Sequence, residues 1–131
     1  MTEYSFPKNE KLKSRTLINM LFEEGNSEYS FPVKVFWLAS PTNSSSAVQA
    51  GFSVPKKKFK RAVDRNLLKR RMKESYRLNK AELIDLANNK NLNLSLFFIF
   101  SANSILDYHQ IEKSIVNQLK LICKKSVSKK Q

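Results

Sequence analysis

A long helical pattern over about Arg61–Leu86 constrains the fold of this chain more than any other feature. Neither Gly nor Pro interrupts it, and Leu68, Met72, Tyr76 and Leu83 recur along it at helical spacing. Residues spaced by three and four lie on one face of a helix, and an apolar face has to be covered by another layer. We therefore expect a long helix that packs on a sheet.

Segments typical of β-strands flank this helix. Phe31–Ser40 is rich in aromatic and β-branched residues, Ala47–Val54 alternates between apolar and polar positions, and Leu94–Ser101 is largely apolar. Pro41–Ser46 reads as a turn or short loop, so we expect the first two strands to form a hairpin. Asn88–Asn93 ends the helical pattern, and the long helical connection would let Ala47–Val54 and Leu94–Ser101 lie parallel.

Two further helices are expected near the ends of the chain. Ser14–Glu24 has helical spacing, with Ser14 as a possible N-cap and Gly25 at the C-cap position. Asp107 is placed to cap a last helix that reaches about Lys124. The predicted order is helix, strand, strand, helix, strand, helix, which is an α/β sandwich with a mixed sheet.

The length of 131 residues fits one domain, 1–131. We expect an irregular N-terminal arm over 1–13 and a disordered basic tail over 125–131. No apolar stretch approaches the roughly 20 residues that span a bilayer, and the N-terminus lacks the apolar centre of a signal peptide. These features predict a cytoplasmic protein that does not bind membranes.

The charge of the chain is strongly one-sided. Lys and Arg number 24 against 11 Asp and Glu, which gives a formal net charge of +13. Half of the 24 basic residues fall between Lys56 and Lys80, where Asp64 and Glu74 are the only acids. Such a concentration of like charge costs self-repulsion, which a polyanionic partner relieves.

Helical phasing places many of these charges on one face of the long helix, beside its apolar face. A solvated helix face usually mixes signs because like charges at i,i+4 repel, so a stripe of one sign favours polyanion binding. Arginine adds bidentate phosphate contacts, and an asparagine can reach a base edge or a 2′-hydroxyl. The stripe consists of Asn66, Lys69, Arg70, Lys73, Arg77 and Lys80.

No residue pattern supports hydrolysis by the protein itself. His109 is the only histidine, the carboxylates are scattered, and two-metal nuclease sites need several convergent carboxylates. The single Cys123 excludes an internal disulfide and a cysteine-based metal cluster, and is expected to be a buried small hydrophobe. We expect no catalytic residue and no metal bound by the protein alone.

The run Ala62–Glu74, with Arg65-Asn66 followed by Lys69-Arg70, resembles the signature of the bacterial ribonuclease P protein subunit. The preceding segment, Gly51–Lys57, matches the strand and lysine pair that come before that signature in the family. The resemblance covers nearly the whole chain. Lys73 departs from the arginine usual in the family, so the charge is kept while the planar fork is lost.

The resemblance implies a fold of the ribosomal protein S5 domain 2-like type, with a left-handed β-α-β crossover through the basic helix. It also implies that this helix binds the catalytic RNA subunit, which holds the Mg²⁺ and hydrolyses precursor tRNA. We expect the free protein to be monomeric and to be inactive without the RNA subunit. The residues assigned to the RNA subunit are Arg61, Arg65, Asn66, Lys69, Arg70, Lys73, Arg77 and Lys80.

A cleft between the first helix and the sheet holds the 5′ leader of precursor tRNA in the resembling family. Spacing alone leaves it even whether Phe22 and Phe36 are core residues or line such a cleft, and the resemblance favours the cleft. Ile18 departs from the aromatic residue usual at its position. The matching residues are Ile18, Phe22, Lys34, Phe36, Lys56 and Lys57.

Two other functions fit the charge and the predicted fold. A ribosomal or RNA-chaperone protein with no part in an enzyme would look the same outside Arg65–Glu74. A DNA-binding protein that inserts the basic helix into a major groove fits less well, because the sequence shows no apolar seam for dimerisation.

Overall fold

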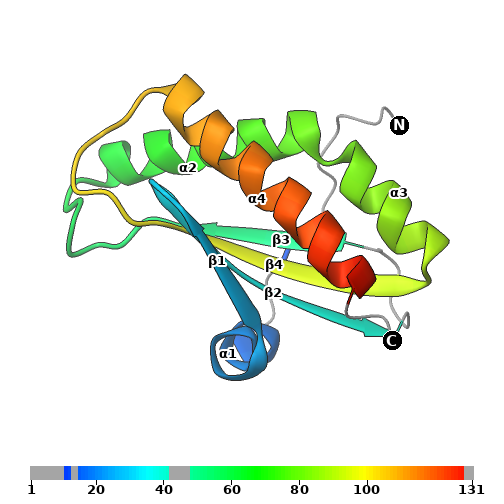
Figure 1. The fold of residues 1–131 in the computed structure, drawn as a ribbon. Coiled ribbons are helices and arrows are strands. Elements are labelled where there is room, and N and C mark those ends of the chain that lie inside the picture. The colour runs from blue at the N-terminus through cyan, green and yellow to red at the C-terminus, as the bar shows by residue number, and fades with distance from the viewer. Residues whose placement is uncertain (1–10, 13–14, 42–47, 129–131) are drawn as a thin grey trace.

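The computed structural model describes residues 11–12, 15–41 and 48–128, and Figure 1 shows how their elements are arranged. These residues form four helices and four strands. Their order is α1 (Arg15–Glu24), β1 (Asn26–Ser30), β2 (Val33–Pro41), β3 (Val48–Ser53), α2 (Ala62–Asn79), α3 (Ala81–Asn89), β4 (Leu92–Phe100) and α4 (Tyr108–Ser128).

The strands form one sheet in the order β1-β2-β4-β3. β2 is antiparallel to both β1 and β4, whereas β3 is parallel to β4. The predicted parallel pair is therefore confirmed, but the predicted hairpin between β2 and β3 is wrong, because β4 lies between them. β4 takes the central place because it is apolar on both faces: Leu96 and Phe98 are buried, and Phe97 and Ile99 are partly buried on the other face.

The two faces of the sheet are covered unequally. α2, α3 and α4 lie over one face, and α1 lies against the other (Figure 1). Val33, Val35 and Trp37 of β2 alternate onto the three-helix face and are fully buried. The predicted mixed α/β fold is confirmed, while the left-handed crossover between β3 and β4 stays a prediction.

β1 and the segment before α1 were not predicted as parts of the sheet. β1 is polar. Its Glu28 carboxylate accepts a hydrogen bond from the Trp37 indole Nε1 at 3.4 Å and forms an ion pair with the Lys125 ammonium at 2.9 Å. Leu12 is buried, and its N–H donates to the Ala50 carbonyl at 2.9 Å. The end of the expected N-terminal arm is thus tied to the edge of β3, and residues 1–10 lie outside the described part.

The helix ends follow the predictions in part. The Asp107 carboxylate accepts a hydrogen bond from the Gln110 N–H at 2.9 Å, which confirms the cap of α4. α4 continues past Lys124 to Ser128, so the expected disordered tail does not begin at residue 125. The Gly25 N–H donates to the Leu21 carbonyl at 3.0 Å, which closes α1 as predicted. The predicted Ser14 cap and most of the Pro41–Ser46 loop lie outside the described residues.

In the described ranges, no helix is long and apolar enough to cross a membrane.

Candidate nucleic-acid interface

α2 separates its apolar and basic residues as the sequence predicts. Leu68, Met72 and Tyr76 are fully buried against the sheet and α4. Arg70 and Lys73 are exposed on the other side of the helix. The exposed part of the basic stripe also includes Asn66, and Lys69 is partly buried.

The start of α2 is organised by Arg65. Its guanidinium donates to the carbonyls of Phe59 and Lys60 at 2.8 and 2.9 Å. These bonds fold the preceding turn against the helix, so Arg65 has a structural role beside the predicted contact with RNA. Arg61, exposed at the N-cap, lies 3.9 Å from the Asp64 carboxylate. An exposed pair at this distance is weak and leaves Arg61 accessible to an anion.

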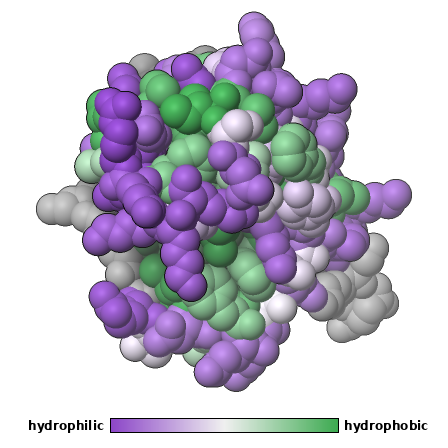
Figure 2. All heavy atoms as spheres, turned by 90° about the vertical axis from the view of Figure 1, so that its left-hand side faces the viewer, coloured by the Kyte–Doolittle hydropathy of each residue, from purple (hydrophilic) through white to green (hydrophobic). Residues whose placement is uncertain are grey.

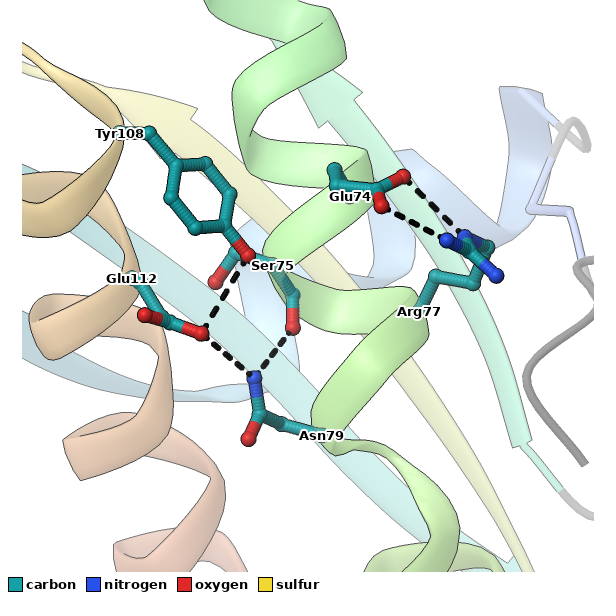
Figure 3. Close-up of polar contacts among 6 residues, drawn as sticks. All are labelled: Glu74, Ser75, Arg77, Asn79, Tyr108 and Glu112. Carbon is teal, nitrogen blue, oxygen red and sulfur yellow. Dashed lines mark hydrogen bonds and ion pairs between the residues drawn. The ribbon is translucent and has the colours of Figure 1, made fainter.

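Arg77 is neutralised locally by Glu74. Two guanidinium nitrogens lie 2.6 and 3.1 Å from the Glu74 carboxylate oxygens (Figure 3). The hydrogen bond to Arg77 lowers the pKa of Glu74, so this carboxylate stays ionised and the pair persists at neutral pH. The unbalanced charge of the stripe is therefore concentrated at Lys69, Arg70 and Lys73.

Lys80, the last member of the predicted stripe, is 1% exposed and does not belong to the surface. The prediction assumed a continuous helix to Leu86, but the chain turns at Lys80 and begins α3 at Ala81. The turn changes the helical phase and directs the Lys80 side chain inward. The assignment of Lys80 to RNA binding was wrong for this reason.

The burial of Lys80 can be tested by comparing it with exposed Lys73. Binding of RNA weakens as salt rises, so the plot of log K against log salt has a negative slope. We expect Lys73→Met to make this slope less steep by about 1, because one phosphate contact is lost. Lys80→Met keeps the buried stem and should leave that slope unchanged. Filter binding over a salt series measures both slopes, and a matching loss at Lys80 would contradict its burial.

A polar network fixes α2 to α4 on the side away from the stripe. The Tyr108 hydroxyl donates to Glu112 at 3.3 Å, and the Asn79 amide donates to the Ser75 carbonyl at 2.8 Å and to Glu112 at 3.5 Å (Figure 3). Burial and the Glu112 carboxylate raise the pKa of Tyr108, so its hydroxyl stays a donor. Arg71 donates to the Leu106 carbonyl before α4. The stripe is thus presented by a helix held at several points.

The aromatic residues predicted for the cleft come together between α1 and the sheet face opposite α2–α4, and the cleft itself stays a prediction. The rings of Phe22 and Phe36 meet edge to face with centroids 5.0 Å apart. The Lys34 ammonium lies 5.0 Å from the centre of the Phe36 ring. Phe22 is 45% exposed and Phe36 and Ile18 are partly buried, so none of the three is sealed in the core.

Phe97 of β4 belongs to the same aromatic cluster, although it was not predicted as a site residue. Its ring lies 5.7 Å from that of Phe22, centroid to centroid. Pairing of Phe36 with Phe97 across β2 and β4 puts both rings on one face. The sequence pattern of Leu92–Phe100 could have predicted this place for Phe97, because alternation along the strand puts Phe97 on the face opposite Leu96 and Phe98.

The two lysines predicted for the cleft, Lys56 and Lys57, are exposed in the turn after β3, and their place beside Phe36 stays a prediction. Lys58, which was not predicted for the cleft, donates to the Ser101 carbonyl at the end of β4 at 2.5 Å. Figure 2 looks at the side of the molecule on the left in Figure 1, where a broad hydrophilic band crosses the surface between apolar areas.

No catalytic centre is visible among the described residues. They contain no group of three or more His, Cys, Asp or Glu side chains that could hold a metal ion. Cys123 is partly buried against the core, and burial raises the pKa of its thiol, which makes the nucleophilic thiolate scarce. What the arrangement does offer is a cationic helix face and an aromatic cluster with a lysine beside it.

Known proteins resemble this chain over most of its length. A family model described as Ribonuclease P matches residues 6–123. A ribonuclease P protein component of Porphyromonas gingivalis is 30% identical over 116 residues, which cover 88% of this chain and 85% of the relative. Another, from Citrifermentans bemidjiense, is 33% identical over 115 residues, 88% of this chain and 90% of the relative.

Solved structures share the fold at lower identity. The ribonuclease P protein of Staphylococcus aureus superposes with a TM-score of 0.67 at 21% identity, covering 87% of this chain and 95% of that one. The Thermotoga maritima protein gives 0.67 at 24% identity over 86% and 97% of the two chains. The family match and the similarity to curated relatives, together with this fold, show that the chain belongs to the family of bacterial ribonuclease P protein components.

Proposed function

We propose that two surfaces of this chain bind two different RNAs. As a ribonuclease P protein component, the chain is a subunit of the endoribonuclease that matures the 5′ ends of tRNAs. The exposed stripe of α2 binds the catalytic RNA subunit, and the Phe22–Phe36 cleft binds the 5′ leader of precursor tRNA. The observation that carries this proposal is the aromatic cleft with a lysine, on the opposite side of the sheet from the cationic helix.

The stripe suits a structured RNA, and the cleft suits a single strand. Arg70 can hold a phosphate with two parallel hydrogen bonds, and Asn66 adds a group that can meet a 2′-hydroxyl. Unpaired bases stack on aromatic rings while an ammonium meets the phosphate, which is the combination of Phe36 and Lys34. A net charge of +13 also reduces the repulsion between the two RNAs.

We place the hydrolytic chemistry on the RNA subunit together with its Mg²⁺. The described side chains do not fit a metal site, because they offer no convergent group of carboxylates. The role of this chain is then to bind and orient: it strengthens the fold of the RNA and the binding of substrate. We further propose that it works in the cytoplasm and is a monomer before assembly.

Reconstitution tests this function. The protein alone should cleave no precursor tRNA, whereas mixing it with its cognate ribonuclease P RNA at low Mg²⁺ should restore accurate 5′ cleavage. The reason is that protein charge replaces part of the cation screening that the RNA otherwise needs. Gel analysis of the products measures the outcome, and lack of restoration with the cognate RNA would overturn the proposal.

A ribosomal or RNA-chaperone role makes a different prediction for co-purification. If the tagged protein recovers one dominant RNA species, the ribonuclease P function is supported. Recovery of whole ribosomal subunits would support the alternative instead.

A further inference from the structure

Tyr29 of β1 lies on the same face of the sheet as Phe36. It pairs with Lys34 across β1 and β2, and directly paired residues point to the same face. Its neighbour Glu28 faces the opposite side, where its carboxylate accepts a hydrogen bond from Trp37. Because β1 is an edge strand, Tyr29 also borders a pocket lined by Asn117, Lys120, Leu121 and Lys124 of α4. The Tyr29 side chain is 59% exposed, more than that of Phe22 in the cleft.

The Tyr29 ring is held in place by Ser101. The Tyr29 hydroxyl lies 3.3 Å from Ser101 Oγ, which itself lies 3.0 Å from the Pro32 carbonyl. The Ser101 N–H also donates to the Pro32 carbonyl at 2.8 Å, so the end of β4 is fixed beside the turn that follows Tyr29. An exposed ring whose far end is tethered loses little freedom when a base stacks on it.

Lys58 adds a cation at this end of the sheet. Its ammonium donates to the Ser101 carbonyl, so Lys58 and Tyr29 meet the same residue from two sides. One bond to a carbonyl leaves the ammonium with two further N–H donors for a phosphate. The sheet face thus carries aromatic and cationic groups in alternation. In order along the track, they are Phe22, Phe36, Lys34, Tyr29 and Lys58.

We propose that Tyr29 is a second stacking position for a nucleotide of the precursor tRNA leader, with Lys58 as its phosphate partner. This inference rests on the proposed function of the Phe22–Phe36 cleft.

The test measures the affinity of the reconstituted holoenzyme for precursor tRNAs whose leaders are shortened one nucleotide at a time. Tyr29→Ala should weaken binding of leader-bearing substrates about five-fold or more and leave mature tRNA unchanged. Its loss should appear at a different leader length from the loss caused by Phe36→Ala, because the two rings contact different nucleotides. Tyr29→Phe keeps the aromatic face and loses only the bond to Ser101, so it should bind leader-bearing substrates much more tightly than Tyr29→Ala. Lys58→Ala should weaken leader binding, while Lys90→Ala, an exposed lysine at the end of α3, should not.

The outcomes separate this inference from the function on which it rests. If Phe36→Ala loses leader affinity and Tyr29→Ala binds every leader like the unchanged protein, the second stacking position is overturned and the cleft stands. If neither variant shows a leader-dependent loss, both proposals fail. Equal weakening of mature and leader-bearing tRNA by Tyr29→Ala would also overturn the assignment. The exposed position of Tyr29 lets the Ala variant fold, and an unchanged thermal unfolding temperature verifies this.

Discussion

Reversing the charge of Arg70 and Lys73 together should raise the Kd for the ribonuclease P RNA on the order of 100-fold, about 2.7 kcal/mol. Both side chains are exposed on α2, and among the described residues neither is neutralised by a carboxylate as Arg77 is by Glu74. The variant Arg70→Glu/Lys73→Glu removes two phosphate contacts and places two carboxylates against the RNA backbone. The negative slope of log K against log salt should also become less steep by about 2. Equilibrium binding of labelled RNA over a salt series measures both quantities.

A matched control separates local contact from overall charge. Lys113→Glu/Lys120→Glu changes two exposed lysines of α4 and gives the same net charge, because two reversals take +13 to +9 in either variant. We expect the α4 variant to weaken RNA binding only slightly, since screening at physiological salt acts over about 8 Å. Equal weakening by the two variants would show that net charge, rather than the stripe of α2, holds the RNA.

The strand pairing illustrates what local sequence patterns leave open. Alternation identified β2, β3 and β4, but chain proximity suggested a hairpin of β2 with β3. The apolar character of β4 on both faces was the available sign that this strand is central and needs two partners. β1 shows no such pattern. Asn26–Ser30 is polar and pairs with β2, where Glu28 meets Trp37 of that strand and Lys125 of the distant α4.

The end of α2 shows a similar limit in the prediction of the site. Helical spacing correctly separated the buried residues Leu68, Met72 and Tyr76 from the exposed Arg70 and Lys73. It failed at Lys80, because nothing between Arg61 and Leu86 breaks a helix locally. The turn at Lys80 lets α3 pack against α4 and β4 and bury Leu83 and Ala87, which is a tertiary effect.

The residue pattern alone did not decide whether Phe22 and Phe36 are core residues or line a cleft, and only the family resemblance favoured the cleft. Spacing placed Phe36 and Lys34 on the face opposite Trp37, but it did not say what covers that face. The rings form one cluster because of the position of α1, which places the ring centroid of Phe22 5.0 Å from that of Phe36.

Replacing Phe36 with Ala should reduce the preference of the holoenzyme for precursor over mature tRNA. Loss of one stacking ring costs about 1–3 kcal/mol, which corresponds to roughly a 5- to 150-fold loss in affinity for leader-bearing substrate. Affinity for mature tRNA should stay the same, because it has no leader to occupy the cleft. Competition between the two tRNAs for a limiting amount of holoenzyme measures this preference directly.

The choice of controls matters because Phe36 also supports its neighbours. Its ring contacts Phe22, so the Ala variant removes packing as well as the stacking surface. Phe36→Leu restores most of the apolar volume without an aromatic face, whereas Phe36→Tyr keeps the face. If stacking on the leader is the function of this residue, Leu should behave like Ala in the competition, and Tyr like the unchanged protein. Full recovery by Leu would instead mean that Phe36 serves only to pack α1 on the sheet. Equal losses for precursor and mature tRNA would remove the leader from this cleft.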